Sequence, residues 1–220
     1  MTALDPRRLA VFCDFDGTIT EPDTLRFLTE NVGGGVPLFE EIGRQLRAGK
    51  IGIRKGVAWE VGSVRIPFAE AVPLLRAGVT IDPGFAPLAA WCRARTIPLT
   101  ILSAGLGEIV DAMLSPDTLA GVEVLANALR PGTWEVVFRD ESDHGHDKSV
   151  AIKVARDAGR RTVFIGDGIS DWAPAEVADE VFAKRGRSLV EHCRRRGIAC
   201  VEYESLADVL EHLEARVVGP

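Results

Sequence analysis

The sequence is poor in the features that most quickly assign a chain to a class. Its four cysteines are widely spaced and form no CxxC pair, which disfavours a zinc site or a disulfide scaffold. No apolar stretch approaches the roughly 18 residues of a membrane span, and residues 1–8 lack the apolar run of a signal peptide. Acidic residues outnumber basic ones by 32 to 26, so the basic excess of a general nucleic-acid binder is missing. We therefore expect a cytoplasmic protein with reduced thiols and neither a nucleic-acid nor a membrane partner.

What the sequence does contain is an ordinary globular composition. Apolar residues make up 46% and charged residues 26%, which excludes wholesale disorder. A chain of 220 residues can bury roughly 70% of its unfolded surface, so it needs no disulfide or metal to fold. It has no internal repeat and no low-complexity segment. We expect one to two domains, in a monomer or a homodimer.

The hydrophobic pattern predicts a sheet whose strands alternate with helices. Apolar runs too short for helices predict strands at residues 9–13, 97–102, 162–165, 181–183 and 198–201. Helical patterns lie at residues 84–95, 108–114, 148–158, 171–178, 188–196 and 206–217, and two β-like stretches, 122–127 and 134–138, flank a Pro-Gly turn as a hairpin. This alternation predicts an α/β fold with a doubly wound, Rossmann-like, mostly parallel sheet.

One long segment departs from this alternation. Residues 22–82 show helical spacing, broken by three glycines at 33–35 and by Pro67 and Pro73, and contain no strong strand pattern. They are predicted to form a small helical cap domain inserted after the first strand, with residues 1–21 and 83–220 as the α/β core domain. An inserted lid over a strand-end site can exclude water and select small substrates.

Polar side chains follow three of the predicted strands, where ligands bind in open α/β sheets. They are Asp14, Asp16, Ser103, Asp167 and Asp171, while Lys148 opens the helix that leads into the strand before Asp167. Two carboxylates ~4 Å apart repel by about 4 kcal/mol at an effective dielectric near 20, and one lysine cannot offset four of them. Oxygen ligands favour Mg²⁺ over zinc as the balancing cation. Backbone N–H groups of the helix after residues 103–105 would then complete a site for a phosphoryl group.

The spacing of Asp14 and Asp16 allows two roles in one site. They lie two positions apart, so both reach the site only if the backbone turns between them, which Gly17 permits. One carboxylate can act as a nucleophile and form an aspartyl-phosphate. The other can protonate the leaving oxygen and then take a proton from water. Each motif alone has a plainer explanation, such as a helix N-cap at Ser103 or a surface position for Lys148, but their occurrence in order favours phosphoryl chemistry.

These motifs together resemble a known family. Asp14-Phe15-Asp16-Gly17-Thr18, Ser103, Lys148 and Gly166-Asp167-Gly168-Ile169-Ser170-Asp171 resemble the four ordered motifs of the haloacid dehalogenase-like hydrolases. The helical insert resembles the cap of the phosphoserine-phosphatase-like branch. Residues 53–57, 81–85, 181–183, 193 and 197–198 are similar to the 2-hydroxy-3-keto-5-methylthiopentenyl-1-phosphate phosphatases of methionine salvage. Two departures concern the substrate: Ser170 replaces a usual Asn of phosphoserine phosphatases, and His144-Gly145-His146-Asp147 stands where the methionine-salvage enzymes usually carry cysteines.

The resemblance implies a role for each motif residue. Asp14 is expected to be the nucleophile, and Asp16 the general acid/base that also offers its backbone carbonyl to Mg²⁺. Lys148 is expected to neutralise Asp14 and the phosphate, Asp167 to bind Mg²⁺, and Asp171 to orient the site or Lys148. The expected metal ligands are thus Asp14, Asp16 and Asp167, and the expected substrate-binding residues are Thr18, Asp23, Arg54, Ser103, Ala104 and Gly105.

Three functions remain open at this stage. The first is a Mg²⁺-dependent phosphomonoesterase acting on a small cytosolic metabolite. Its leading substrate is the methylthiopentenyl phosphate; a phosphoserine or phosphoethanolamine-type ester is the alternative, because Asp23 could meet an ammonium and Arg54 a carboxylate. The second is a phosphoacceptor signalling module, which uses similar groups but is shorter and has no cap. The third is a non-catalytic metabolite binder. A separate transition-metal site at His144, His146 and Asp147 is less favoured than a solvated loop, because no thiolate lies nearby.

Overall fold

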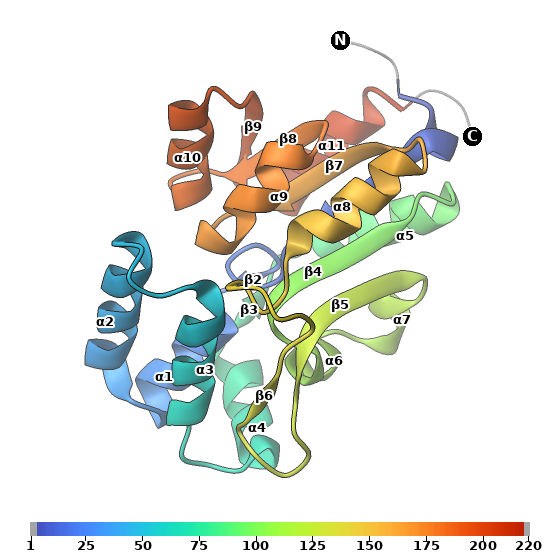
Figure 1. The fold of residues 1–220 in the computed structure, drawn as a ribbon. Helices are drawn as coiled ribbons and strands as arrows, with labels where there is room; N and C mark the ends of the chain where they lie inside the picture. Colours follow the sequence, from blue (N-terminus) through green and yellow to red (C-terminus); the bar gives the residue numbers. More distant parts are fainter. Residues whose placement is uncertain (1–3, 218–220) are drawn as a thin grey trace.

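The computed structural model describes residues 4–217, which are built around a seven-stranded sheet (Figure 1). The strand order is β6-β5-β4-β1-β7-β8-β9, and every neighbouring pair is parallel except β5 and β6. The strands are β1 (Leu9–Cys13), β4 (Leu99–Leu106), β5 (Val122–Leu129), β6 (Val136–Val137), β7 (Arg161–Gly166), β8 (Glu180–Lys184) and β9 (Cys200–Tyr203). The predicted doubly wound, mostly parallel α/β fold is confirmed, including the hairpin that joins β5 to β6.

Helices cover both faces of this sheet. One face carries α8 (Lys148–Asp157), α9 (Trp172–Val177) and α10 (Ser188–Arg196), and the other carries α5 (Phe85–Ala94), α6 (Gly107–Met113), α7 (Pro116–Leu119) and α11 (Leu206–Glu214). Short 3-10 helices lie at η1 (Pro6–Arg8) and η2 (Ile169–Asp171). Side chains of β1 pack on both faces of the sheet. Leu9, Val11 and Cys13 are buried in one apolar cluster, and Ala10 and Phe12 are buried in the other. This two-sided burial explains why the strand is a continuous apolar run.

Four helices between the first strand and α5 form a separate layer beside the sheet, at the lower left of Figure 1. They are α1 (Thr24–Val32), α2 (Gly35–Arg47), α3 (Ile53–Ser63) and α4 (Phe68–Gly78). The chain enters and leaves this layer through two antiparallel strands, β2 (Thr20–Glu21) and β3 (Thr80–Ile81). The sequence of residues 22–82 shows no strong strand pattern, and β3 has only two residues, which are too few to show a periodic pattern. No helix of residues 4–217 is both long and apolar enough to cross a membrane.

Strand β4 is irregular where the sequence predicts its end. Residues 99–102 pair in register with 122–125 of β5, but Leu106 pairs with Asn127, so the register shifts between Leu102 and Leu106. The Asn127 amide donates a hydrogen bond to the carbonyl of Ala104 at 2.7 Å, which holds the irregular stretch against β5. Ser103, Ala104 and Gly105 therefore lie in a bulge rather than directly at a helix N-terminus, because the strand continues to Leu106 and α6 begins at Gly107.

Candidate active site

The loop after β1 brings the first carboxylates to the edge of the sheet. The backbone N–H of Asp14 donates to the carbonyl of Ile165 in β7 at 2.9 Å, which fixes the start of the loop. The chain then turns at Gly17, whose φ is +81°. A Cβ atom at Gly17 would lie 2.5 Å from Oδ2 of Asp167. Glycine is therefore required both by the backbone angle and by the close approach of the Asp167 carboxylate.

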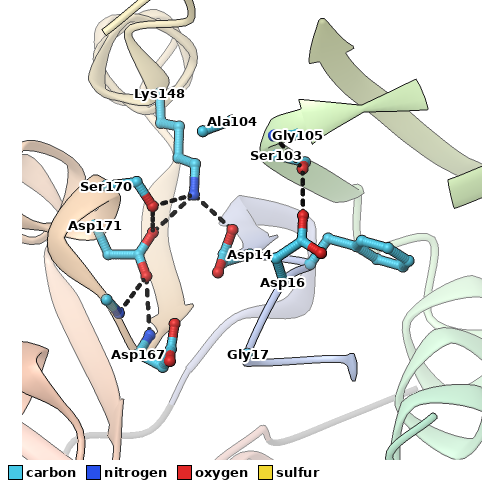
Figure 2. A network of polar contacts seen from close by, with 12 residues as sticks. Asp14, Asp16, Gly17, Ser103, Ala104, Gly105, Lys148, Asp167, Ser170 and Asp171 are labelled. Atoms are coloured by element: carbon cyan, nitrogen blue, oxygen red, sulfur yellow. Dashed lines mark hydrogen bonds and ion pairs between the residues drawn. The ribbon is translucent and has the colours of Figure 1, made fainter. Parts of the chain in front are cut away.

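Lys148 connects two carboxylates at the centre of the site (Figure 2). Its Nζ donates to Oδ1 of Asp14 at 2.5 Å, to Oδ1 of Asp171 at 2.8 Å and to Oγ of Ser170 at 3.2 Å. Burial lowers the pKa of Lys148, but Asp14 and Asp171 outweigh it and raise the pKa above its usual value. Lys148 is thus a fixed, buried cation between the first and last motifs.

Asp171 positions both this lysine and the loop that carries Asp167. Its Oδ2 accepts hydrogen bonds from the backbone N–H groups of Asp167 at 2.8 Å and Gly168 at 3.0 Å. Its Oδ1 faces Lys148, so both oxygens of the fully buried carboxylate are occupied. Asp171 therefore holds the Lys148 ammonium and the backbone of Asp167 and Gly168 in place.

The carboxylates carry more negative charge than Lys148 balances. Burial and then Asp171 raise the pKa of Asp14 to about 7, and burial together with Asp14 and Asp171 raises the pKa of Asp167 well above its usual value. One oxygen from each of these three residues lies within 4.8 Å of the others. Both carboxylate oxygens of Asp171 already accept hydrogen bonds, whereas Lys148 contacts only Oδ1 of Asp14. Asp14 and Asp167 are therefore the side chains that could hold a divalent cation. Their hard oxygen donors fit Mg²⁺.

Asp16 is not part of this acidic group, and its carboxylate is held by the first residue of the helical layer. Its Oδ1 accepts hydrogen bonds from the backbone N–H of Thr24 at 2.9 Å and from the Thr24 hydroxyl at 2.5 Å. The hydroxyl of Ser103 lies 3.5 Å from its Oδ2 (Figure 2). Burial and then Asp23 raise the pKa of Asp16 to about 7. A carboxyl group with that pKa can hold or release a proton near neutral pH.

The β4 bulge lies against Asp16 and offers small residues to the site. Ser103 Oγ accepts a hydrogen bond from the backbone N–H of Gly105 at 2.9 Å. A Cβ atom at Gly105 would lie 2.5 Å from Oδ2 of Asp16, so a larger residue would displace that carboxylate. Ala104 and Gly105 both line the cavity described below.

The segment before Lys148 is organised by its own polar side chains. His146 is buried, its Nδ1 lies 2.9 Å from the carbonyl of Ser103, and burial lowers its pKa. Asp147 is the N-cap of α8 and accepts a hydrogen bond from the backbone N–H of Ser149 at 3.0 Å. Within residues 4–217, the acidic group around Asp14 is the set of potential metal ligands that converges, and neither His144 nor His146 belongs to it.

A cavity of about 520 Å³ separates the strand ends from the helical layer. One wall carries Asp14, Asp16 and Asp167, and the opposite wall is largely apolar, formed by Leu25, Phe39, Ile42, Leu46, Ile53 and Val57. Three acidic side chains of the helical layer also line the cavity: Asp23 and Glu60, which are half-buried, and Glu40, which is exposed. Asp23 is also the N-cap of α1 and accepts from the backbone N–H of Arg26 at 2.9 Å.

Glu60 is a cavity residue that the sequence-based prediction missed. Its position carried a signal, because Ile53, Val57 and Glu60 are spaced to share one face of a helix. An acid on an otherwise apolar helix face is unusual and indicates either a buried partner or a ligand.

Three predicted substrate-binding residues, Thr18, Arg54 and Ser103, do not line this cavity. The guanidinium of Arg54 donates to the carbonyl of Asp140, lies 3.2 Å from the Glu141 carboxylate and covers the ring of Phe138 at 4.5 Å. Arg54 therefore attaches α3 to the segment that precedes Lys148 rather than facing the site. Thr18 is fully buried. The remaining predicted residues, Asp14, Asp16, Asp23, Ala104, Gly105 and Asp167, all line the cavity, and Ser103, Lys148 and Asp171 contact residues that do.

Comparison with known proteins identifies the family. The family model described as haloacid dehalogenase-like hydrolase matches residues 11–176, which include every motif from Asp14 to Asp171. The chain belongs to the haloacid dehalogenase-like hydrolases. The match spans the loop after β1, the helical layer and the acidic group, so the resemblance predicted from the sequence is confirmed.

Curated haloacid dehalogenase-like relatives are similar over most of their length. Pdp3-interacting factor 1 of Schizosaccharomyces pombe is 34% identical over 219 residues, covering 94% of this chain and 96% of the relative. The polyol phosphate phosphatase PYP1 of Saccharomyces cerevisiae is 27% identical, covering 96% and 95%. A 2-hydroxy-3-keto-5-methylthiopentenyl-1-phosphate phosphatase of Brevibacillus brevis is 30% identical, covering 81% and 83%.

Solved structures share the fold. A substrate-bound phosphoserine phosphatase superposes with a TM-score of 0.70 at 18% identity, covering 94% of this chain and 98% of that one. The phosphoserine phosphatase of T. onnurineus also has a TM-score of 0.70, at 21% identity and with 96% and 98% coverage. This haloacid dehalogenase-like hydrolase is therefore a phosphatase, and its fold is that of the phosphoserine phosphatases.

Proposed function

We propose that the chain is a Mg²⁺-dependent phosphomonoesterase that works through an aspartyl-phosphate on Asp14. The observation that carries this proposal is the divergence of two carboxylates from one loop. Asp14 contacts Lys148 inside the acidic group, whereas Asp16 is held by Thr24 beside the β4 bulge. The two carboxyl groups can thus serve different steps of one reaction.

The reaction proceeds in two displacements. An oxygen of Asp14 attacks phosphorus, the bond between phosphorus and the ester oxygen breaks, and Asp16 gives its proton to the leaving alkoxide. Asp16, now ionised, takes a proton from water, whose oxygen attacks phosphorus and releases phosphate from Asp14. Mg²⁺ held by Asp14 and Asp167 would supply positive charge to the phosphoryl oxygens.

The other residues of the chain hold these groups in place. Lys148 balances charge on Asp14 and the phosphoryl group, and Asp171 fixes the lysine. Ser103 and the small residues Ala104 and Gly105 provide donors and space for the phosphoryl oxygens next to Asp16. The helical layer closes the cavity on the opposite side and limits its size to small substrates.

Two substrate candidates are supported by different observations. The methylthiopentenyl phosphate remains the leading candidate, and the cytoplasm is the compartment we propose. Two relatives are named as phosphatases of this ester, and the apolar wall can contact its methylthio tail. A polyol phosphate is the second, favoured by the relative PYP1 and by Asp23 and Glu60, whose oxygens can accept from hydroxyl groups. The phosphoserine alternative loses Arg54 as the partner for its carboxylate.

The test is phosphate release from these esters and from an aryl phosphate, with Mg²⁺ and with excess chelator. The Asp14→Asn variant is the blank. We expect Mg²⁺-dependent release that the variant lacks. Stable phosphorylation of Asp14 without phosphate release would contradict the proposal and favour a phosphoacceptor module.

A further inference from the structure

Glu60 is an acidic side chain that lines the cavity and has no hydrogen-bonding partner among the residues that the structure describes. It lies on the same face of α3 as Ile53 and Val57 and lines the cavity, opposite the wall that carries Asp14, Asp16 and Asp167. Within residues 4–217, no hydrogen bond or ion pair engages its carboxylate, and the charged groups that influence it are Asp23 and Asp16. Burial and these two neighbours raise the pKa of Glu60 well above its usual value.

Asp23 adds a second carboxyl group to the cavity that Glu60 lines. It lines the cavity together with Glu60, and its pKa is raised by burial and also by Asp14. Asp23 receives backbone N–H groups at the start of α1, whereas Glu60 receives none. The substrate-facing acids thus retain free acceptor oxygens, which a bound molecule can use.

Among the described residues, the arginines that line the cavity form no ion pair with Glu60 or Asp23. Arg187 donates to both oxygens of Glu21, at 2.6 and 2.5 Å, and Asp23 raises the pKa of Arg187 less than Glu21 does. Arg47 is exposed on α2 at the rim, with its guanidinium folded against Gly43. A substrate carboxylate placed beside Glu60 and Asp23 would therefore lie next to two acidic side chains rather than next to an arginine.

We propose that Glu60, together with Asp23, selects phosphate esters whose alcohol portion carries hydrogen-bond donors and no carboxylate. This inference rests on the proposed phosphomonoesterase function and adds the substrate class. Hydroxyl groups or an ammonium can donate hydrogen bonds to the Glu60 oxygens. These bonds replace the hydrogen bonds to water that Glu60 loses when the substrate binds. A bound donor stabilises the ionised form of Glu60, which burial and the neighbouring acids oppose, whereas a carboxylate in the same place adds a further negative charge and leaves the acids without a donor.

Matched pairs of esters test the selection directly. Phosphoethanolamine and phosphoserine differ by one carboxylate, and glycerol 3-phosphate and 3-phosphoglycerate differ by a primary alcohol in place of a carboxylate. With Mg²⁺ present, we expect kcat/KM to be about tenfold or more higher for the carboxylate-free member of each pair. Comparison of phosphoethanolamine with glycerol 3-phosphate then separates an ammonium from a hydroxyl as the preferred donor.

Variants assign the effect to Glu60. Glu60→Gln removes the charge and keeps the size, so it should reduce the ratio within each pair. Glu70→Gln, an exposed position on α4 that does not line the cavity, is the matched control and should leave both ratios as in the wild type. Thermal unfolding of each variant checks folding, and the wild-type ratios stand even if Glu60→Gln does not fold.

The outcomes separate this inference from the proposed function. Turnover of an aryl phosphate together with ratios near one, or with preference for the carboxylate member, would overturn the inference and leave the phosphatase intact. Unchanged ratios in folded Glu60→Gln would overturn the role of Glu60. Absence of Mg²⁺-dependent turnover for the aryl phosphate, the methylthiopentenyl phosphate and all four esters would instead refute the proposed function.

Discussion

Replacing Gly17 by alanine should damage the enzyme in two separable ways. The first is backbone strain, because φ is +81° and a non-glycine residue there costs roughly 1–2 kcal/mol. For a chain of about this length, each kcal/mol lowers Tm by roughly 2–4 °C. The second is steric, because the new Cβ would lie 2.5 Å from Oδ2 and 2.8 Å from Cγ of Asp167.

The steric effect falls on a proposed Mg²⁺ ligand. Asp167 is held by its backbone N–H to Asp171, so its carboxylate must rotate or the loop must move to admit the methyl group. Disturbing the orientation of a metal ligand typically costs about 10–100-fold in metal affinity or activity. We therefore expect the Mg²⁺ concentration for half-maximal phosphate release to rise by about 10–100-fold in Gly17→Ala.

Gly159→Ala is the matched control for this prediction. Gly159 has a similar φ of +78°, but no atom of the described residues lies within 4 Å of the position that its Cβ would take, its own chain neighbours aside. Both variants should lose similar stability in thermal unfolding, and only Gly17→Ala should change the Mg²⁺ titration of activity. Equal Mg²⁺ requirements in the two variants would refute the argument that Gly17 makes room for Asp167.

Three further predictions concern single side chains. Asp16→Asn should lower kcat for an alkyl phosphate by about 10²–10⁴-fold and have a smaller effect on an aryl phosphate, whose leaving group needs less protonation; equal losses in steady-state kinetics would contradict its role as the acid. Arg54→Ala should destabilise the fold by about 1 kcal/mol in urea unfolding, through loss of the Phe138 and Glu141 contacts. A selective loss of phosphoserine turnover would instead place Arg54 at the substrate. Because burial lowers the pKa of His146, its protonation favours the unfolded state, so wild-type stability should fall as pH drops below about 6.5. His146→Gln should show a smaller fall over that range, and parallel curves of unfolding free energy against pH would count against this linkage.

Local sequence patterns predicted the fold because the strands are short apolar runs that end in polar turns. Strand β1 was predicted at residues 9–13 and lies at Leu9–Cys13. The missed features depend on contacts between distant residues. The extension of β4 through Ser103 needs β5 pairing and the Asn127 amide, 23 residues away from the Ala104 carbonyl it binds. Residues 103–105 resemble a turn when considered alone, so their sequence favoured the end of the strand.

The site was predictable in the core and less so in the helical layer. The core residues follow strand ends, and parallel strands bring such positions to one edge whatever their separation in sequence. In α3, by contrast, the function of each residue depends on which helix face meets the cavity. Ile53, Val57 and Glu60 share the cavity face, whereas Arg54 lies against the segment before Lys148. Residue type favoured Arg54, but helical periodicity favours Glu60.

The hydrogen bonds of Asp16 connect the helical layer to the proposed proton donor. Thr24 holds the Asp16 carboxylate through its backbone N–H and its hydroxyl, and Thr24 is the first residue of α1. Thr24 lies only ten positions after Asp14, so the loop after β1 carries the proposed nucleophile at one end and the entry to the helical layer at the other. A shift of α1 would move Asp16, the proposed proton donor, relative to Asp14, which Lys148 and β7 hold in place. In the proposed mechanism, the position of the helical layer therefore determines both which leaving group fits the cavity and whether Asp16 can protonate it.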